Sequence, residues 1–150
     1  MPISHKKQYD IIVAGGGPAG IVAAIAATRN GAKTLLVERY GFLGGQSSAA
    51  LVYPWMSFHD PQGNQVITGI AQEIVERLVA MGGSPGHVPD TIGYVSLFTP
   101  FDVEAFKYVA QEMVLEAGAD LLFHTWITEA AMEQEHIASL GAINKSGRCA

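Results

Sequence analysis

Cysteine is almost absent from this sequence of 150 residues, because its one cysteine, Cys149, stands next to the last position. A single thiol excludes an intrachain disulfide. It also excludes a cysteine-ligated [4Fe-4S] cluster within this chain, since such a cluster normally needs four cysteine ligands. We therefore expect a reducing compartment and assign the chain to the cytoplasm.

Charged residues are also scarce, at 15% of the sequence against 49% hydrophobic residues. Basic residues are the rarer kind, with 9 Lys and Arg against 14 Asp and Glu, which gives a net charge of −5. An acidic balance argues against nucleic acid or an anionic membrane as the main partner. No apolar run approaches the roughly 18 residues of a membrane-spanning helix, so we predict no membrane span.

The sequence offers little that could hold a metal or carry out catalysis by itself. His87, His124 and His136 lack the spacing of metal ligands, and His59 belongs to no recognisable pairing with a catalytic acid or metal-ligand spacing. We predict no metal site and name no catalytic residue.

Glycine, by contrast, is abundant, and three glycines form a GxGxxG turn directly after a short apolar run. The run at residues 11–14 is largely β-branched, as expected of a strand buried on both faces of a parallel sheet. Gly15 allows a tight turn, and Gly17 leaves the backbone bare for a pyrophosphate. Gly20 lets the following helix lie close to the strand.

A helix and a second strand complete this unit. Pro18 suits the first helical turn, and the backbone N–H groups beside it, from Ala19 onward, are left for an anion. The helix ends at Gly31, and a strand at residues 33–37 then places Glu38 about 20 residues after the motif, where a carboxylate can accept hydrogen bonds from ribose hydroxyls. The order of these features predicts a dinucleotide-binding β-α-β unit.

A second glycine-bearing loop, residues 39–48, follows at the C-terminal edge of the predicted sheet, where ligands of open α/β sheets bind. Two consecutive glycines would let the backbone approach a bulky ligand, and the next side chains supply neutral donors: Gly44, Gly45, Gln46, Ser47 and Ser48. The alternative is a plain glycine turn.

These segments carry a resemblance to a known family. YDIIVAGGGPAG, TLLVER and FLGGQSS together resemble the N-terminal part of the FAD-dependent oxidoreductases with the glutathione-reductase-type flavin fold. The similarity is greatest to the branch related to the A-subunit of heterodisulfide reductase, which GIAQEIVERL and FDVEAFKYVAQEMVLEAGADLLFHT also resemble. Some relatives in that branch carry iron-sulfur clusters, so an iron-sulfur partner is possible in full-length relatives.

The resemblance implies FAD as the cofactor. The glycine turn would bind the pyrophosphate of FAD, and Glu38 would bind its adenosine ribose. The second glycine loop would lie against the cofactor, and the backbone near Ile127 would contact the adenine. The residues expected to bind the cofactor are Gly15, Gly17, Pro18, Ala19, Gly20, Glu38, Arg39, Gly44, Gly45, Gln46, Ser47 and Ile127.

The predicted fold class is α/β, a Rossmann-like FAD/NAD(P)-binding domain with a parallel sheet in the order 3-2-1 and an antiparallel β-meander. Periodicity predicts helices at residues 67–81 and 103–117, the second capped by Asp102, and a third strand at 121–124. We divide the chain into a dinucleotide-binding unit with the glycine loop, a helical and loop excursion, a helix with the third strand, and the start of the meander: residues 9–48, 49–101, 102–125 and 126–150.

The excursion contains an aromatic stretch among prolines at residues 53–63. These rings could line a pocket, or they could cap the core, and we favour the core because large aromatic side chains are mostly buried for packing.

Two alternatives to an FAD-binding portion stay open. The glycine turn and the acidic residue after the second strand would also suit an NAD(P)-binding domain. Glu38 disfavours NADP, however, because a carboxylate repels a 2′-phosphate. A non-catalytic nucleotide-binding subunit is the other alternative. We expect the chain to be truncated before the later strands of the flavin fold, as the N-terminal portion of a longer enzyme whose substrate and electron partner this sequence leaves unknown.

Overall fold

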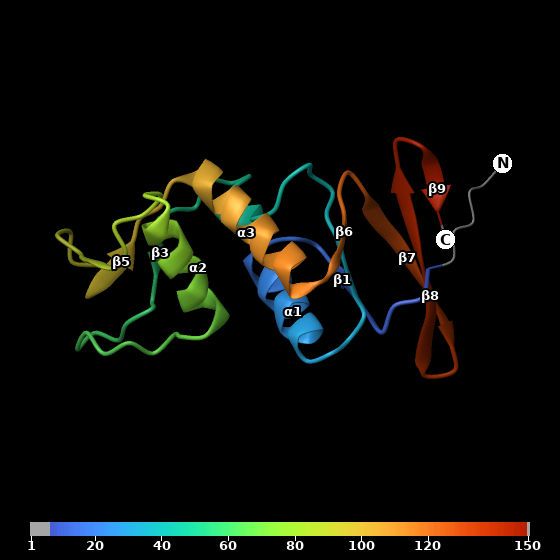
Figure 1. Ribbon diagram of the computed structural model, residues 1–150, viewed down its shortest axis with the longest axis horizontal. Helices are drawn as coiled ribbons and strands as arrows, with labels where there is room; N and C mark the ends of the chain where they lie inside the picture. Colours follow the sequence, from blue (N-terminus) through green and yellow to red (C-terminus); the bar gives the residue numbers. More distant parts are fainter. Residues whose placement is uncertain (1–6, 150) are drawn as a thin grey trace.

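A computed structural model describes residues 7–149 and shows three small β-sheets and three α-helices in that range (Figure 1). The elements in chain order are β1 (Ile11–Ala14), α1 (Pro18–Arg29), β2 (Thr34–Val37), the 3-10 turn η1 (Gly45–Ser47), β3 (Trp55–Met56), α2 (Ile70–Ala80), β4 (Val88–Pro89), β5 (Leu97–Thr99), α3 (Val103–Ala117), β6 (Asp120–Leu122), β7 (Trp126–Glu133), β8 (His136–Asn144) and β9 (Gly147–Cys149).

The parallel sheet has the strand order β1-β2-β6, which confirms the predicted order 3-2-1. Leu35 pairs with Ile12 on one side of β2 and with Asp120 on the other, in parallel register. The third strand ends two residues earlier than predicted, because His124 has a φ of 54° and so leaves the extended region.

Helices α1 and α3 lie on one side of this sheet, and the antiparallel meander β7-β8-β9 lies on the other (Figure 1). The predicted meander is thereby confirmed. The core fills the space between the helices and the sheet and extends to α2, and its fully buried side chains are Ile21, Ala24, Ile25, Leu36, Leu43, Leu78, Ala110, Met113 and Val114.

Both long predicted helices form, and their ends follow local chemistry. The Asp102 side chain accepts a hydrogen bond from the Ala105 N–H at 2.7 Å and caps α3, as predicted. Helix α2 begins only after Gly69, whose φ of 66° is not helical. The helix also ends one residue before the predicted end, because Met81 is its C-cap residue and is 48% exposed.

The excursion between η1 and α3 contains a small antiparallel sheet in the order β3-β5-β4. The sequence did not predict it, because strands of two or three residues carry no readable alternation. No helix within residues 7–149 combines the length and apolar character needed to cross a membrane.

The aromatic stretch mainly caps the core, as favoured. The Trp55 ring lies 4.1 Å from the Phe101 ring and 5.0 Å from the Phe106 ring, measured between centroids. Trp55 is partly buried and Phe58 is buried, whereas Tyr53 is about half exposed.

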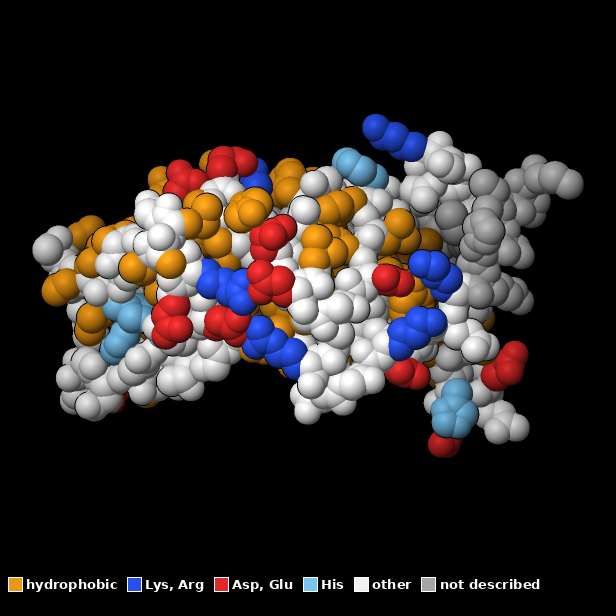
Figure 2. All heavy atoms as spheres, viewed as in Figure 1, with side chains coloured by type: hydrophobic (Ala, Val, Ile, Leu, Met, Phe, Trp, Pro, Cys, Tyr) orange, Lys and Arg blue, Asp and Glu red, His pale blue; other side chains and the backbone are white. Residues whose placement is uncertain are grey.

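Ion pairs connect the three helices on the surface. Glu73 of α2 accepts hydrogen bonds from Arg29 of α1 at 2.7 Å and from Arg77 at 3.0 Å. Arg77 also contacts Glu116 of α3 at 2.6 Å. Acidic and basic side chains accordingly alternate over α1 and α2 (Figure 2). The hydrogen bond from Arg29, and secondarily that from Arg77, lowers the pKa of Glu73.

We expect Glu73→Gln to lower the free energy of unfolding at pH 7 by about 1 kcal/mol, because the pairs are partly exposed and solvent screens them. Since the pKa of Glu73 is lowered in the folded state, its contribution is present above the pKa of the unfolded chain and is lost as the pH falls through the folded-state pKa. Urea unfolding of both proteins from pH 7 down to pH 3 measures this. The control Glu104→Gln removes an exposed i,i+3 pair within α3, and an equal effect there would contradict a special role for the network.

Within residues 7–149, strand β1 pairs only with β2, so one of its backbone edges has no partner strand. Ile11 in this strand is 40% exposed. Apolar strands with an open edge template association with other chains.

We therefore expect the 150-residue chain, expressed alone, to sediment as dimers or larger species. Ile11→Lys should shift it toward the monomer, because a charge on an edge strand opposes pairing. The matched control Val79→Lys places the same charge at an exposed apolar position on α2 and should leave association unchanged. A monomeric wild-type chain would show that the edge is harmless.

Candidate functional site

The turn between β1 and α1 depends on its glycines. Gly15 has a φ of 111°, and its N–H donates to the Val37 carbonyl at 2.8 Å. A Cβ on Gly20 would lie 1.9 Å from the Gly15 carbonyl oxygen, so no other residue fits there. Gly17, in contrast, has an ordinary φ of −73°, and the nearest atom to a Cβ there would be 3.9 Å away. Gly17 is therefore not required for the fold of the turn.

The start of α1 leaves backbone donors free. The Ile21 N–H donates to the Gly17 carbonyl at 2.9 Å. In the described part of the chain, the N–H groups of Gly17, Ala19 and Gly20 have no acceptor. Because a helix N-terminus carries partial positive charge, this arrangement fits an anionic group such as a diphosphate. Pro18 occupies the first helical position, as predicted.

Glu38 lies at the end of β2 and is buried, with 5% of its surface exposed. Its Oε2 accepts a hydrogen bond from the Gly16 N–H at 2.6 Å, and its Oε1 accepts one from the Tyr40 N–H at 2.9 Å. A carboxylate has about four acceptor positions, two on each oxygen. Each oxygen of Glu38 therefore has one acceptor position left after its backbone hydrogen bond. The two backbone bonds hold the carboxylate in place, and the remaining lone pairs suit the two hydroxyls of a ribose.

A cavity of about 210 Å³ joins residues that are far apart in the sequence. Four of the predicted site residues line it together: Gly15, Glu38, Arg39 and Ile127. They come from the ends of β1 and β2 and from the start of β7. The cavity is completed by Ala14, Val37, Thr125 and Trp126.

The second glycine loop packs directly against the first. The Gly44 N–H donates to the Gly16 carbonyl at 2.8 Å, and a Cβ on Gly45 would lie 2.8 Å from the Gly17 Cα. Gly44 and Gly45 have φ values of 117° and 47°. Close approach of the two loops therefore requires these glycines, and contact of the second loop with a ligand stays a prediction.

The polar residues at the end of this loop have different environments. Gln46 is exposed. Ser47 is buried, and its hydroxyl accepts a hydrogen bond from the Trp55 Nε1–H at 2.8 Å. The Ser48 hydroxyl donates to the Leu43 carbonyl at 2.8 Å, so the expectation that Ser48 offers a donor to a ligand is wrong.

The sequence reasoning missed several residues around the cavity. Thr125 is buried, and its N–H donates to the Glu38 carbonyl oxygen at 3.1 Å, which joins the end of β2 to the start of the meander. Trp126 lines the cavity at the first position of β7, and Tyr40 provides the second donor to Glu38. The predicted change from strand to meander near residue 126, and the adenine contact that the resemblance implies near Ile127, were the sequence signals for this part of the site.

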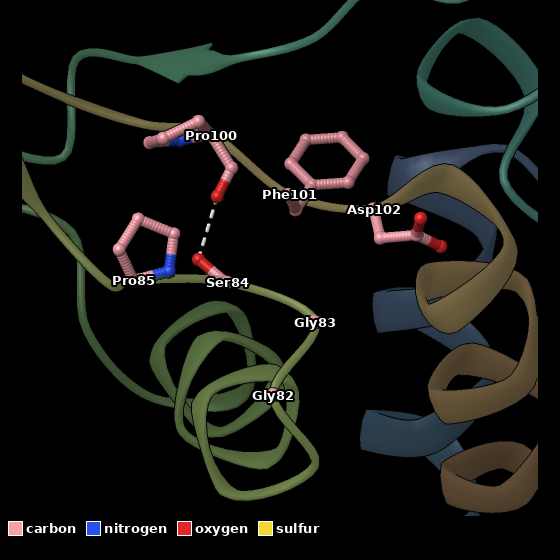
Figure 3. Close-up of a pocket in the computed structure, with 7 residues that line it drawn as sticks. All are labelled: Gly82, Gly83, Ser84, Pro85, Pro100, Phe101 and Asp102. Carbon is pink, nitrogen blue, oxygen red and sulfur yellow. Dashed lines mark hydrogen bonds between the residues drawn. The ribbon is translucent and has the colours of Figure 1, made fainter.

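A second, open cavity of about 470 Å³ lies between α2 and α3 (Figure 3). The Ser84 hydroxyl donates to the Pro100 carbonyl at 2.6 Å across this cavity (Figure 3) and accepts from the Gly86 N–H at 3.0 Å. Asp102 caps α3. Because its polar side chains already have partners within the chain, this cavity adds nothing to the site.

His87 has both ring nitrogens engaged, with Nδ1 at 2.7 Å from the Thr99 hydroxyl and Nε2 at 2.9 Å from Gln72 Oε1. The amide oxygen can only accept, which assigns the ring proton to Nε2. Burial, and then the neighbouring His59, lowers the pKa of His87. Among residues 7–149, no group of three or more His, Cys, Asp or Glu side chains could hold a metal ion.

Comparison with known proteins gives partial matches to several flavin enzymes. The chain is 38% identical over 73 residues to ferredoxin–NADP reductase of Streptococcus agalactiae serotype Ia, which covers 49% of the chain and 21% of that protein. It is 40% identical over 85 residues to dihydrolipoyl dehydrogenase of Trypanosoma brucei brucei, covering 52% of the chain and 16% of that protein. The chain thus spans about a fifth or less of the length of these two relatives.

Solved structures share the fold. THI4 of Thermovibrio ammonificans matches 92% of the chain and 48% of its own length, with a TM-score of 0.60 and 17% identity. The myxobacterial halogenase CndH, described as FAD-dependent, matches 94% of the chain and 35% of its own length, with a TM-score of 0.62 and 16% identity. The sequence model of the FAD dependent oxidoreductase family matches residues 10–150. The chain belongs to the FAD-dependent oxidoreductase family.

Proposed function

We propose that the cavity at the ends of β1 and β2 and the start of β7 binds the adenosine half of FAD, and that the start of α1 binds its diphosphate. The observation that carries this proposal is the position of the buried Glu38 carboxylate, which lies in the cavity and is hydrogen-bonded to the glycine turn. A nucleotide whose phosphates meet the N–H groups of Gly17, Ala19 and Gly20 would place its ribose at Glu38.

The other site residues receive roles on the same basis. Pro18 fixes the start of α1, and Gly44, Gly45, Gln46 and Ser47 would lie along the cofactor, since Gly44 and Gly45 already contact the glycine turn. Ile127 would meet the base, because it lines the cavity on the meander side. Bound FAD supplies electron or hydride transfer, and this chain positions it and shields it from water.

The NAD(P)-binding alternative is less well supported. A buried carboxylate at the ribose position repels a 2′-phosphate. FAD and NAD(P) both contain an ADP part, which the glycine turn and the acid would bind in either cofactor. Membership of the FAD-dependent oxidoreductase family favours FAD.

For the whole protein we propose membership of the branch related to the A-subunit of heterodisulfide reductase, supported by the sequence of α2 and α3. An electron-transfer partner, and in full-length relatives an iron-sulfur protein, would suit that branch. The curated relatives include ferredoxin–NADP reductases, whose name states an electron carrier. The scarcity of cysteine supports a reducing location such as the cytoplasm.

We also propose that residues 9–48 form the dinucleotide-binding unit, 49–101 an excursion, 102–125 the returning helix and strand, and 126–150 the start of the meander. The pairing of β6 with β2, and of β7 with β8, supports the last two boundaries.

We expect Gly17→Val to give full-length protein that folds but is purified without the yellow colour of oxidised flavin. The backbone of Gly17 tolerates a side chain, so a valine would occupy the space proposed for the diphosphate rather than disturb the turn. Visible absorbance and circular dichroism measure the two effects separately.

Two further variants control this experiment. Ala130→Val, at an exposed position of β7, should remain yellow, and Gly20→Val should fail to fold because its Cβ would overlap the Gly15 carbonyl. A Gly17→Val protein with full flavin content would overturn the diphosphate assignment.

We expect Glu38→Ala to weaken FAD binding by about tenfold or more, since hydrogen bonds to a charged group contribute roughly 1.5 to 3 kcal/mol each. Titration of FAD into flavin-free full-length protein measures the affinity. The control Glu129→Ala removes an exposed carboxylate of β7. Because Glu38 also accepts from Gly16 and Tyr40, urea unfolding of each variant must accompany the titration, and unchanged affinity in a folded variant would contradict ribose binding.

A further inference from the structure

Trp55 connects the second glycine loop to the small sheet of the excursion. Its Nε1–H donates a hydrogen bond to the Ser47 hydroxyl at 2.8 Å. Its backbone belongs to β3 and pairs with Thr99 of β5, which is fully buried. Trp55 itself is not among the residues that line the adenosine cavity. The loop that would lie along the cofactor is therefore fastened to an element outside that cavity.

The Trp55 ring is held in place by two other aromatic rings. It lies 4.1 Å from the Phe101 ring, at an angle of 32°, and 5.0 Å from the Phe106 ring, at an angle of 86°. Both of these phenylalanines are buried. Phe106 of α3 also packs against the second loop, because a Cβ on Gly44 would lie 2.8 Å from its Cε1. Ring contacts of this kind restrict the indole, so its N–H points in a fixed direction.

The hydrogen bond from Trp55 determines what the Ser47 hydroxyl can still do. An indole N–H can only donate, so Ser47 Oγ accepts in this bond and keeps its own hydrogen. Within residues 7–149 that hydrogen has no protein acceptor, whereas the Ser48 hydroxyl donates to the Leu43 carbonyl. Ser47 is 3% exposed, and a buried donor without an acceptor is unfavourable. An oxygen atom of a ligand at this point would satisfy it.

The second loop contacts the glycine turn away from the adenosine cavity. The Gly44 N–H donates to the Gly16 carbonyl at 2.8 Å, and Gly45 lies against Gly17 at the start of α1. None of residues 44–47 lines the adenosine cavity. A cofactor with its adenosine in that cavity therefore reaches the second loop only with the part that lies beyond the adenosine.

Resting on the proposed FAD site, we propose that Trp55 is a positioning residue for the cofactor. Through the Ser47 hydroxyl it holds the second glycine loop against the part of FAD beyond the adenosine. The excursion contributes to cofactor binding in this way, since its small sheet and the aromatic rings around it fix the indole. The affinity for whole FAD depends on Trp55, and the affinity for adenosine alone does not.

Titration of FAD and, separately, of adenosine into flavin-free full-length protein tests this inference. Trp55→Phe keeps an aromatic ring and removes the N–H donor. We expect it to weaken FAD binding by about threefold to tenfold, the effect of one hydrogen bond, and to leave adenosine binding unchanged. Ser47→Ala removes the acceptor without altering the ring and should show the same difference between the two ligands. The double variant should bind FAD no more weakly than Ser47→Ala, because Trp55 acts through that hydroxyl.

Phe58→Leu is the matched control for a purely structural effect. Phe58 is buried, and its ring lies 6.4 Å from the Trp55 ring. Its replacement removes aromatic surface from the same cluster and leaves the bond between Trp55 and Ser47 in place. Urea unfolding should show a lower midpoint for Phe58→Leu than for Trp55→Phe, while the FAD affinity of Phe58→Leu stays that of wild type.

Three results would overturn the inference. Equal losses for FAD and adenosine would make Trp55 a general support of the fold, and Ser47→Ala decides this point by itself if Trp55→Phe does not fold. Additive losses in the double variant would make Trp55 an independent contact. Wild-type FAD affinity in folded Trp55→Phe would show that the bond does not position the loop. A wild-type protein that binds no FAD at all would instead refute the proposed function, so the two failures are distinguishable.

Discussion

The hydrogen bond from the Gly16 N–H to the buried carboxylate of Glu38, 2.6 Å long, connects the parts on which the site depends. It joins the turn after β1 to the acid after β2. The carbonyl of the same Gly16 accepts from Gly44, so one peptide segment aligns both glycine loops with the carboxylate. A buried carboxylate is stable only where donors surround it, and here they are backbone groups that cannot rotate away. The site is therefore arranged by the fold itself, before any ligand contributes.

Much of the β-α-β unit and its site was predictable, because the residues that form it interact with close neighbours in the sequence. The GxGxxG spacing, Pro18 and Glu38 each satisfy a steric or electrostatic requirement within a few residues, and the right-handed crossover rule gave the strand order. Asp102 needed only the N–H three residues ahead. The positive φ of Gly15 and the close contact at Gly20 agree with the steric roles predicted for these two glycines, and the diphosphate role of Gly17 stays a prediction.

Long-range contacts were not predictable. The Ser48 hydroxyl turns inward to Leu43, and Ser47 meets Trp55 across the loop, although the sequence shows only a polar run. The approach of Trp126 to Arg39 joins the first residue of β7 to the loop after β2. The strands of the β3-β5-β4 sheet are defined by their antiparallel hydrogen-bonded pairing. They are too short to show an alternation of apolar and polar residues, so only the folded chain reveals them.

The sheet that supports this site also constrains how the chain reaches its fold. Leu35 of β2 pairs with Asp120 of β6, so the third strand can join only after α2, the small sheet and α3 have been synthesised. Loop closure of that length is costly before its contacts form, and parallel pairing of this kind is slow. During synthesis β2 therefore keeps an open edge for as long as the ribosome takes to make the excursion. Synthesis proceeds at about 5 to 20 residues per second, so this edge stays open for several seconds. In that period a chaperone that binds exposed strand edges would protect the chain most.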